Sequence, residues 1–121
     1  MDWFAILIFA AVLAGFFLLR RASLISVRAA REYLKQGAVI VDVRSPEEFA
    51  SGHLLSAVNI PVDDLESELP RRVHDRGRVV LLHCEGGMRS GIAKRKLRAM
   101  GYLNVFNLGS HARAALIVGH K

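Results

Sequence analysis

The chain begins with one long apolar run, after which short apolar and polar stretches alternate. Residues 3–19 form an unbroken run of 17 apolar or small residues. Folded as a helix, this run would extend about 25 Å, at the short end of what crosses the hydrocarbon core of a bilayer. Arg20 and Arg21 end the run, and arginines at such a boundary can reach the lipid headgroups. We therefore predict a transmembrane anchor at residues 1–21.

A cleaved signal peptide is the alternative interpretation of this N-terminal segment. Signal peptides have a basic start and small residues at the cleavage site, whereas this segment starts with Met1-Asp2 and ends in leucines and arginines. The basic residues lie on its C-terminal side, which the positive-inside rule places in the cytoplasm. We expect a single-pass protein of a bacterial inner membrane, with a cytoplasmic domain. A single cysteine agrees with this compartment, since it forms no internal disulfide.

After a short linker at residues 22–25, the predicted domain at residues 26–121 alternates strand-like and helix-like segments. Apolar runs predict strands at residues 38–43, 57–60, 79–83 and 104–108. Amphipathic or capped segments predict helices at residues 27–36, 46–52, 63–69, 90–100 and 110–118. Strands that are apolar throughout are typical of parallel sheets, which are buried on both faces. The alternation therefore predicts an α/β domain with a mainly parallel sheet.

The only cysteine, Cys84, lies in a glycine-rich loop between a predicted strand and a predicted helix. Backbone N–H groups of such a loop can converge on one point, and the following helix adds its positive end. Both effects stabilise a thiolate, so we expect Cys84 to be a catalytic nucleophile. The expected substrate-binding loop consists of Glu85, Gly86, Gly87, Met88, Arg89 and Ser90. Arg89 could hold an anionic donor, and Ser90 could cap the helix or hydrogen-bond the loop. A buried, inert cysteine is the alternative.

Asp42 and Arg44 follow another predicted strand. Sites in parallel sheets lie beyond the carboxyl ends of the strands, so we expect these two residues to support the loop around Cys84. A purely structural role and a role in substrate binding both fit them. The five histidines show no metal-like spacing with each other or with the cysteine, which predicts no metal site. We expect His53 to be structural and His83 to be a hydrogen-bonding residue rather than a base.

Charge is distributed unevenly along the chain. Residues 42–68 carry seven acidic residues and one arginine, whereas residues 71–121 carry eleven basic residues and two acidic ones. The basic half contains Cys84, which suits attraction of an anionic substrate or contact with an anionic membrane surface. Solvated helix faces are the simpler explanation for most of these charges. Nucleic acid is not an expected partner, because stacking aromatic residues are not interleaved with the basic ones.

Two groups of residues together resemble the rhodanese domain. The first group is Asp42-Val43-Arg44, Glu48-Phe49, Gly52-His53, Ala57 and Asn59-Ile60-Pro61. The second group is His83-Cys84, Gly86-Gly87, Arg89-Ser90, Gly101-Tyr102 and Asn107-Leu108-Gly109. The resemblance covers about residues 24–110 and implies a five-stranded, mostly parallel sheet with helices on both faces. The chain departs from the family at Leu55-Ser56, where Pro-Gly is common, and at Ser110-His111, after which no tryptophan follows.

The resemblance implies a sulfurtransferase. Its cysteine would take a sulfane sulfur from a small anionic donor such as thiosulfate, hold it as a persulfide, and pass it to a thiol, cyanide or protein acceptor. No cofactor beyond the covalent persulfide is implied. Glu85 beside the nucleophile would repel a dianion and weaken the use of thiosulfate.

Two other kinds of function also fit the sequence. The domain could be a persulfide carrier without turnover, or an interaction module at the membrane. It could also be a phosphatase or arsenate reductase, although the Cys-x5-Arg loop of related phosphatases places its arginine one position later than Arg89.

Overall fold

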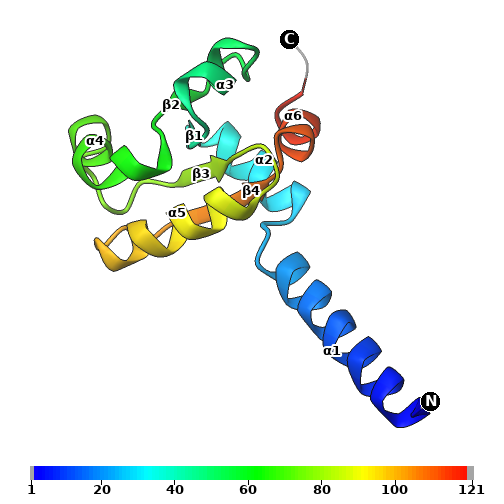
Figure 1. Cartoon of the computed structure of the whole chain (residues 1–121). Coiled ribbons are helices and arrows are strands. Elements are labelled where there is room, and N and C mark those ends of the chain that lie inside the picture. Colours follow the sequence, from blue (N-terminus) through cyan, green and yellow to red (C-terminus); the bar gives the residue numbers. More distant parts are fainter. Residues whose placement is uncertain (1, 120–121) are drawn as a thin grey trace.

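The computed structural model describes residues 2–119, apart from the side chains of residues 21–22. The predicted headgroup contact of Arg21 and the last two residues of the predicted domain lie outside this description. Helix α1 (Trp3–Ala22) extends away from the other elements, which pack together as one α/β unit (Figure 1). None of its apolar window is buried, and within the described residues it is the one helix long and apolar enough to cross a membrane.

The α/β unit is built on a sheet of four parallel strands. They are β1 (Val39–Asp42), β2 (Val58–Asn59), β3 (Val80–His83) and β4 (Val105–Gly109). Their order across the sheet is β2-β1-β3-β4. The register pairs Asp42 with His83, and His83 with Gly109. The last residues of three strands therefore lie side by side, where the strands have their carboxyl ends.

The resemblance implies five strands, whereas the described residues form four, with an isolated parallel bridge beside β4. Leu24 pairs with Asn107 at the free edge of β4, where the backbone N–H of Ile25 donates to the Asn107 carbonyl at 3.0 Å. The segment cannot continue as a strand, because Ser26 caps the next helix by accepting a hydrogen bond from the Ala29 N–H at 3.2 Å. The expectation of five strands was therefore wrong by this one edge element, and the parallel α/β architecture is confirmed.

Helices cover both faces of the sheet, as expected (Figure 1). They are α2 (Val27–Lys35), α3 (Pro46–Ala50), α4 (Leu65–Arg72), α5 (Met88–Ala99) and α6 (His111–Val118), with a short 3₁₀ turn, η1 (Val62–Asp64). The core on one face contains buried residues of α4 and α5, and the core on the other face contains those of α2 and α6.

Strand β3 explains how the sheet positions the cysteine. Successive side chains of a strand point to opposite faces, so Val80 and Leu82 pack on the face of α4 and α5, whereas Leu81 packs on the other face. All three are fully buried, and burial of a leucine side chain stabilises the fold by about 1.5–3 kcal/mol. The same alternation places Cys84 on the α5 face, directly beyond the end of the strand.

Candidate active site around Cys84

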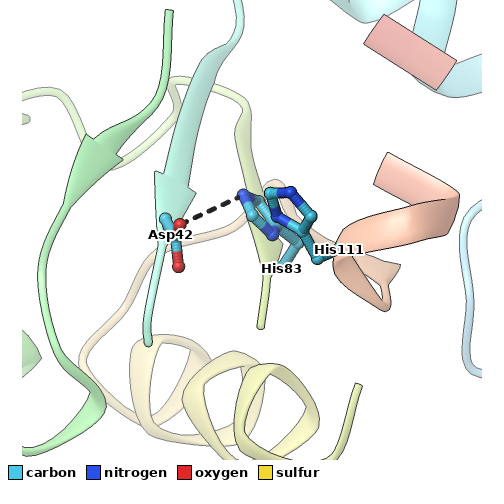
Figure 2. A group of neighbouring side chains, drawn as sticks. All are labelled: Asp42, His83 and His111. Carbon is cyan, nitrogen blue, oxygen red and sulfur yellow. Dashed lines mark ion pairs between the residues drawn. The ribbon is translucent and has the colours of Figure 1, made fainter. Parts of the chain in front are cut away.

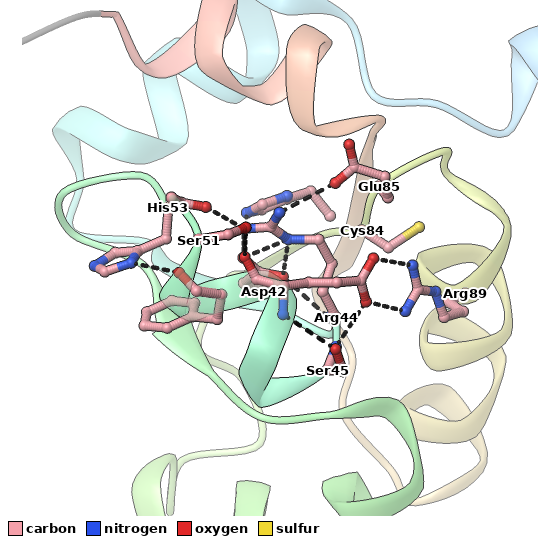
Figure 3. Close-up of polar contacts among 12 residues, drawn as sticks. Asp42, Arg44, Ser45, Ser51, His53, Cys84, Glu85 and Arg89 are labelled. Carbon is pink, nitrogen blue, oxygen red and sulfur yellow. Dashed lines mark hydrogen bonds and ion pairs between the residues drawn. The ribbon is translucent and has the colours of Figure 1, made fainter.

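The Cys84 side chain is 1% exposed and points toward the first turn of α5 (Figure 3). Its backbone N–H donates to the Gly109 carbonyl at 3.2 Å, which extends the pairing of β3 with β4 by one residue. Beyond it, the loop is tied to the start of α6, since the His111 N–H donates to the Glu85 carbonyl at 3.2 Å. Cys84 therefore lies on a loop that is fixed to the end of β4 and to the start of α6.

Two loop groups contact the sulfur. The backbone N–H of Gly87 donates to Cys84 Sγ at 2.9 Å, and Ser90 Oγ lies 3.5 Å from the same atom. Gly87 has a left-handed backbone, with φ of 98°, which turns its N–H inward. Hydrogen bonds to the charged form of a thiol and the positive end of a helix both favour the thiolate. This arrangement suits a sulfur nucleophile that works without a neighbouring base.

Helix α5 begins at Met88, two residues earlier than the predicted start at Ser90. The left-handed conformation of Gly87 ends the loop and lets the helix begin at once. Ser90 is therefore inside the first turn, where its hydroxyl donates to the Gly87 carbonyl at 3.1 Å. Ser90 was expected either to cap the helix or to hydrogen-bond the loop. It forms the hydrogen bond to the loop, and Gly87 is the N-cap of the helix.

Arg89 is bound by Glu48, a contact that the sequence did not predict. The guanidinium donates to both carboxylate oxygens, with Nη1–Oε1 at 2.6 Å and Nη2–Oε2 at 2.9 Å (Figure 3). These hydrogen bonds from Arg89, followed by one from the Ser45 backbone, lower the pKa of Glu48 to about 2. Arg89 was expected to be able to hold an anionic donor, and a carboxylate from α3 already accepts from two of its N–H groups.

Asp42, Arg44 and Glu85 form a second charged group beside the loop. Arg44 is buried and donates through Nε to both Asp42 oxygens, at 3.0 Å each, and through Nη2 to Asp42 Oδ2 at 2.8 Å. Its Nη2 also reaches the Gly52 carbonyl at 2.7 Å, and Nη1 lies 3.1 Å from Glu85 Oε2. The hydrogen bond with Asp42 is the main cause that raises the pKa of Arg44. The predicted pair at the end of β1 therefore extends into the Cys84 loop through Glu85.

The chain matches the rhodanese-like domain over residues 23–111, which is more than half of its length. The chain belongs to the rhodanese-like family. Rhodanese sulfurtransferases act through a cysteine persulfide and need no other cofactor, and Cys84 is the only cysteine of this rhodanese-like protein.

Named relatives support the same family. The thiosulfate sulfurtransferase PspE of Escherichia coli K12 is 38% identical over 69 residues, which cover 57% of this chain and 66% of PspE. Protein YqhL of Bacillus subtilis 168 is 39% identical over 71 residues, covering 59% of this chain and 55% of YqhL. The matched part is thus less than two thirds of either relative.

Solved structures show the same fold. The human single-domain sulfurtransferase TSTD1 superposes with a TM-score of 0.66 and 28% identity, covering 81% of this chain and 98% of TSTD1. A rhodanese from E. coli crystallised with anions superposes with a TM-score of 0.62 and 34% identity, covering 64% of this chain and 91% of that one.

Two histidines of the rhodanese-like domain have different surroundings. His53 stacks on the Phe49 ring at 3.7 Å between centroids, and its Nδ1 lies 2.9 Å from the Phe49 carbonyl, which fits the expected structural role. His83 was expected to form hydrogen bonds, but neither of its ring nitrogens has a partner among the described residues. Its burial is the main cause that lowers its pKa. Asp42 and His111 lie beside it.

Proposed function

We propose that this protein is a membrane-anchored sulfurtransferase that carries a sulfane sulfur on Cys84. The observation that carries the proposal is the N–H of Gly87 at 2.9 Å from Cys84 Sγ, in a loop closed by Ser90. A donor directed at the sulfur stabilises the thiolate before attack and after its release. Membership of the rhodanese-like family and the resemblance to PspE support the type of reaction.

The reaction consists of two displacements at sulfur. The Cys84 thiolate attacks the outer sulfur of the donor, and the new S–S bond forms as the old bond breaks, with its electron pair leaving on the remainder of the donor, which is sulfite when the donor is thiosulfate. The terminal sulfur of the persulfide is then attacked by a thiolate or cyanide. The Cys84 thiolate leaves, so the cycle needs no external oxidant or reductant.

The charges beside the thiol favour a donor with little negative charge. Each of the two neighbouring arginines is paired with a carboxylate, Arg89 with Glu48 and Arg44 with Glu85. A dianion such as thiosulfate must compete with Glu48 for Arg89 and also approach Glu85, which is half exposed. We therefore propose persulfide-type donors as better substrates than thiosulfate, and slow turnover with thiosulfate and cyanide.

Steady-state kinetics of Glu48→Gln test this view of the donor. The substitution removes the competing charge, and glutamine preserves the helix-capping contact with Ser45. We expect kcat/KM for thiosulfate to rise several-fold, with a smaller effect for a small alkyl persulfide, which carries one negative charge instead of two. Glu47→Gln, at an exposed position of the same helix, is the matched control. An unchanged or lower kcat/KM for thiosulfate in Glu48→Gln would refute the competition.

The proposed sulfurtransferase function is tested by thiocyanate formation from thiosulfate or a persulfide donor and cyanide. The full chain in detergent should form thiocyanate, and Cys84→Ser should not. Phosphatase activity without sulfur transfer would overturn the proposal. A persulfide carrier would take up sulfur with one donor equivalent but would not turn over, which single-turnover and steady-state measurements separate.

Helix α1 supports the proposed anchor. Its 18-residue window Trp3–Arg20 has a mean hydropathy of 2.3, and none of that window is buried. The first paired residue of the domain, Leu24, follows only two residues after the helix ends. We propose that the domain is held close to the cytoplasmic surface of the membrane, near a thiol-containing or protein acceptor of the sulfur.

A further inference from the structure

A second polar group lies on the opposite face of the sheet from the Cys84 side chain. It is formed by Asp42 from the end of β1, His83 from the end of β3, and His111, the first residue of α6 (Figure 2). One oxygen or nitrogen atom from each residue lies within 4.8 Å of those from the other two. Asp42 and His83 are fully buried, and His111 is half-buried.

The histidines of this group lack the partners that buried polar atoms normally have. Both ring nitrogens of His83 and Nδ1 of His111 are buried without a hydrogen bond to any described residue. His83 Nε2 and Asp42 Oδ2 are 3.7 Å apart, which is too long for a hydrogen bond. Nearly all buried side-chain nitrogens have a partner, so three orphaned nitrogens on two histidines beside a buried carboxylate indicate that a bound species completes the group.

The surrounding charges favour a cation as that species. Among the side chains that the structure describes, the one cation in hydrogen-bond contact with Asp42 is Arg44, and Arg44 also pairs with Glu85. Two carboxylates and one guanidinium leave this group with a net negative charge when the imidazoles are neutral. Arg44 also fixes the Asp42 carboxylate, as hydrogen-bonded second partners do for carboxylates that bind metals.

We propose that Asp42, His83 and His111 bind one zinc ion, with water as a fourth ligand. Two imidazoles and one carboxylate are a ligand set that zinc accepts. Ligand bonds of about 2.1 Å in a tetrahedron place the ligand atoms about 3.4 Å apart, so the pair now at 3.7 Å fits with a small inward shift. The half-buried His111 offers the entry path.

This site departs from the prediction of no metal, which rested on spacing along the chain. The ligands come from two strand ends and a helix start, at positions 42, 83 and 111, and only the strand register brings them together. The inference does not depend on the sulfurtransferase reaction. Zinc here would join β1, β3 and α6 and would have no role in the displacement at Cys84 Sγ.

Zinc binding to the tag-free full chain in detergent tests the inference. Cys84→Ser is the background for every sample, so that the thiol cannot bind the metal. We expect titration with zinc chloride to saturate at one ion per chain, and cobalt(II) at the same site to give the visible absorption of a four- or five-coordinate ion. His111→Gln should weaken zinc binding at least tenfold and remove the cobalt absorption.

His74→Gln, at an exposed position outside the group, is the matched control and should bind as the background protein does. His111 is preferred over the fully buried His83 as the test position, because its replacement disturbs the core less. Circular dichroism of each variant checks the fold. The inference is overturned if no saturable binding occurs, which would leave a buried water as the partner, or if His111→Gln binds zinc as tightly as His74→Gln.

Discussion

Cys84 and Gly87 are the two residues on which the proposed chemistry depends most. The N–H that contacts the sulfur comes from a glycine whose φ of 98° is strained for any side chain. A Cβ at Gly87 would lie 3.5 Å from the backbone of Gly109, an ordinary contact, so the positive φ is what opposes a side chain here. The N–H of residue 87 can therefore reach Cys84 Sγ without strain only when residue 87 is glycine.

Gly87→Ala tests this link, with Gly86→Ala as its matched control. Alanine at position 87 forces a left-handed non-glycine residue, which we expect to cost about 1–2 kcal/mol of stability and to move the N–H away from Cys84. Gly86 lacks a positive φ and has nothing within 4 Å of an added Cβ. Sulfur transfer should fall at least tenfold in Gly87→Ala and within twofold in Gly86→Ala, measured in one assay. Equal losses in both variants would show that the N–H of residue 87 has no special role.

At the scale of elements, the short helix α3 is a second support of the Cys84 loop. A capping box fixes its start, since Ser45 Oγ accepts from the Glu48 N–H at 3.2 Å and Glu48 Oε1 accepts from the Ser45 N–H at 3.0 Å. The same carboxylate then binds Arg89 in the first turn of α5. Glu48 thus links α3 to α5 through a contact between two residues that are 41 positions apart in the sequence.

This contact predicts a dependence of stability on pH. The pKa of Glu48 is about 2 in the folded chain, below its ordinary value of 4.5, so the folded state favours the ionised carboxylate. Its contribution is fully present above pH 4.5 and is lost as the pH falls toward 2. Denaturation followed by circular dichroism measures the free energy of unfolding of wild type and of Glu48→Gln. The difference between the two should shrink as the pH falls through this range. The gap is expected to be about 1 kcal/mol or less, because the pair is partly exposed. A gap that does not change with pH would contradict this role of Glu48.

Patterns among neighbouring residues predicted most helices and strands. Contacts between residues far apart in the chain could not be predicted from the sequence. The capping box at Ser45 and the apolar run before Cys84 each lie within a few residues, so α3 and β3 could be placed from the sequence. The contact of Arg89 with Glu48 and the position of His83 beside Asp42 and His111 depend on which strands are neighbours and on their register. The N-cap at Ser26 is also a local signal, and it ends the extended segment beside β4 after one bridge.

At the scale of the whole molecule, an exposed apolar helix is joined to a basic domain by a very short connection. None of the apolar window of α1 is buried against the domain. So much exposed apolar surface is unfavourable in water, which favours a lipid or protein environment for this helix. The arginines that follow the run set the expected orientation. The active-site loop would then lie near the cytoplasmic surface of the membrane.

Cysteine labelling tests this orientation in spheroplasts of a bacterium that expresses the protein. In a Cys84→Ser background, Asp2→Cys should react with a membrane-impermeant maleimide in intact spheroplasts. Leu116→Cys, at a position that is 69% exposed on α6, should react only after lysis. Labelling of Leu116→Cys in intact spheroplasts would place the domain outside and contradict the predicted orientation. Recovery of the protein in the soluble fraction would contradict the anchor itself.

The central claim is that Cys84 carries a transferable sulfur, and intact-mass spectrometry measures this directly. The purified full chain, treated with a sulfane donor and then desalted, should gain the mass of one sulfur atom at Cys84. The added mass should disappear on treatment with cyanide as thiocyanate forms in equal amount, and Cys84→Ser should gain nothing. If neither thiosulfate nor a persulfide donor adds sulfur to Cys84, or if Cys84→Ser gains the same mass, the proposed function is wrong.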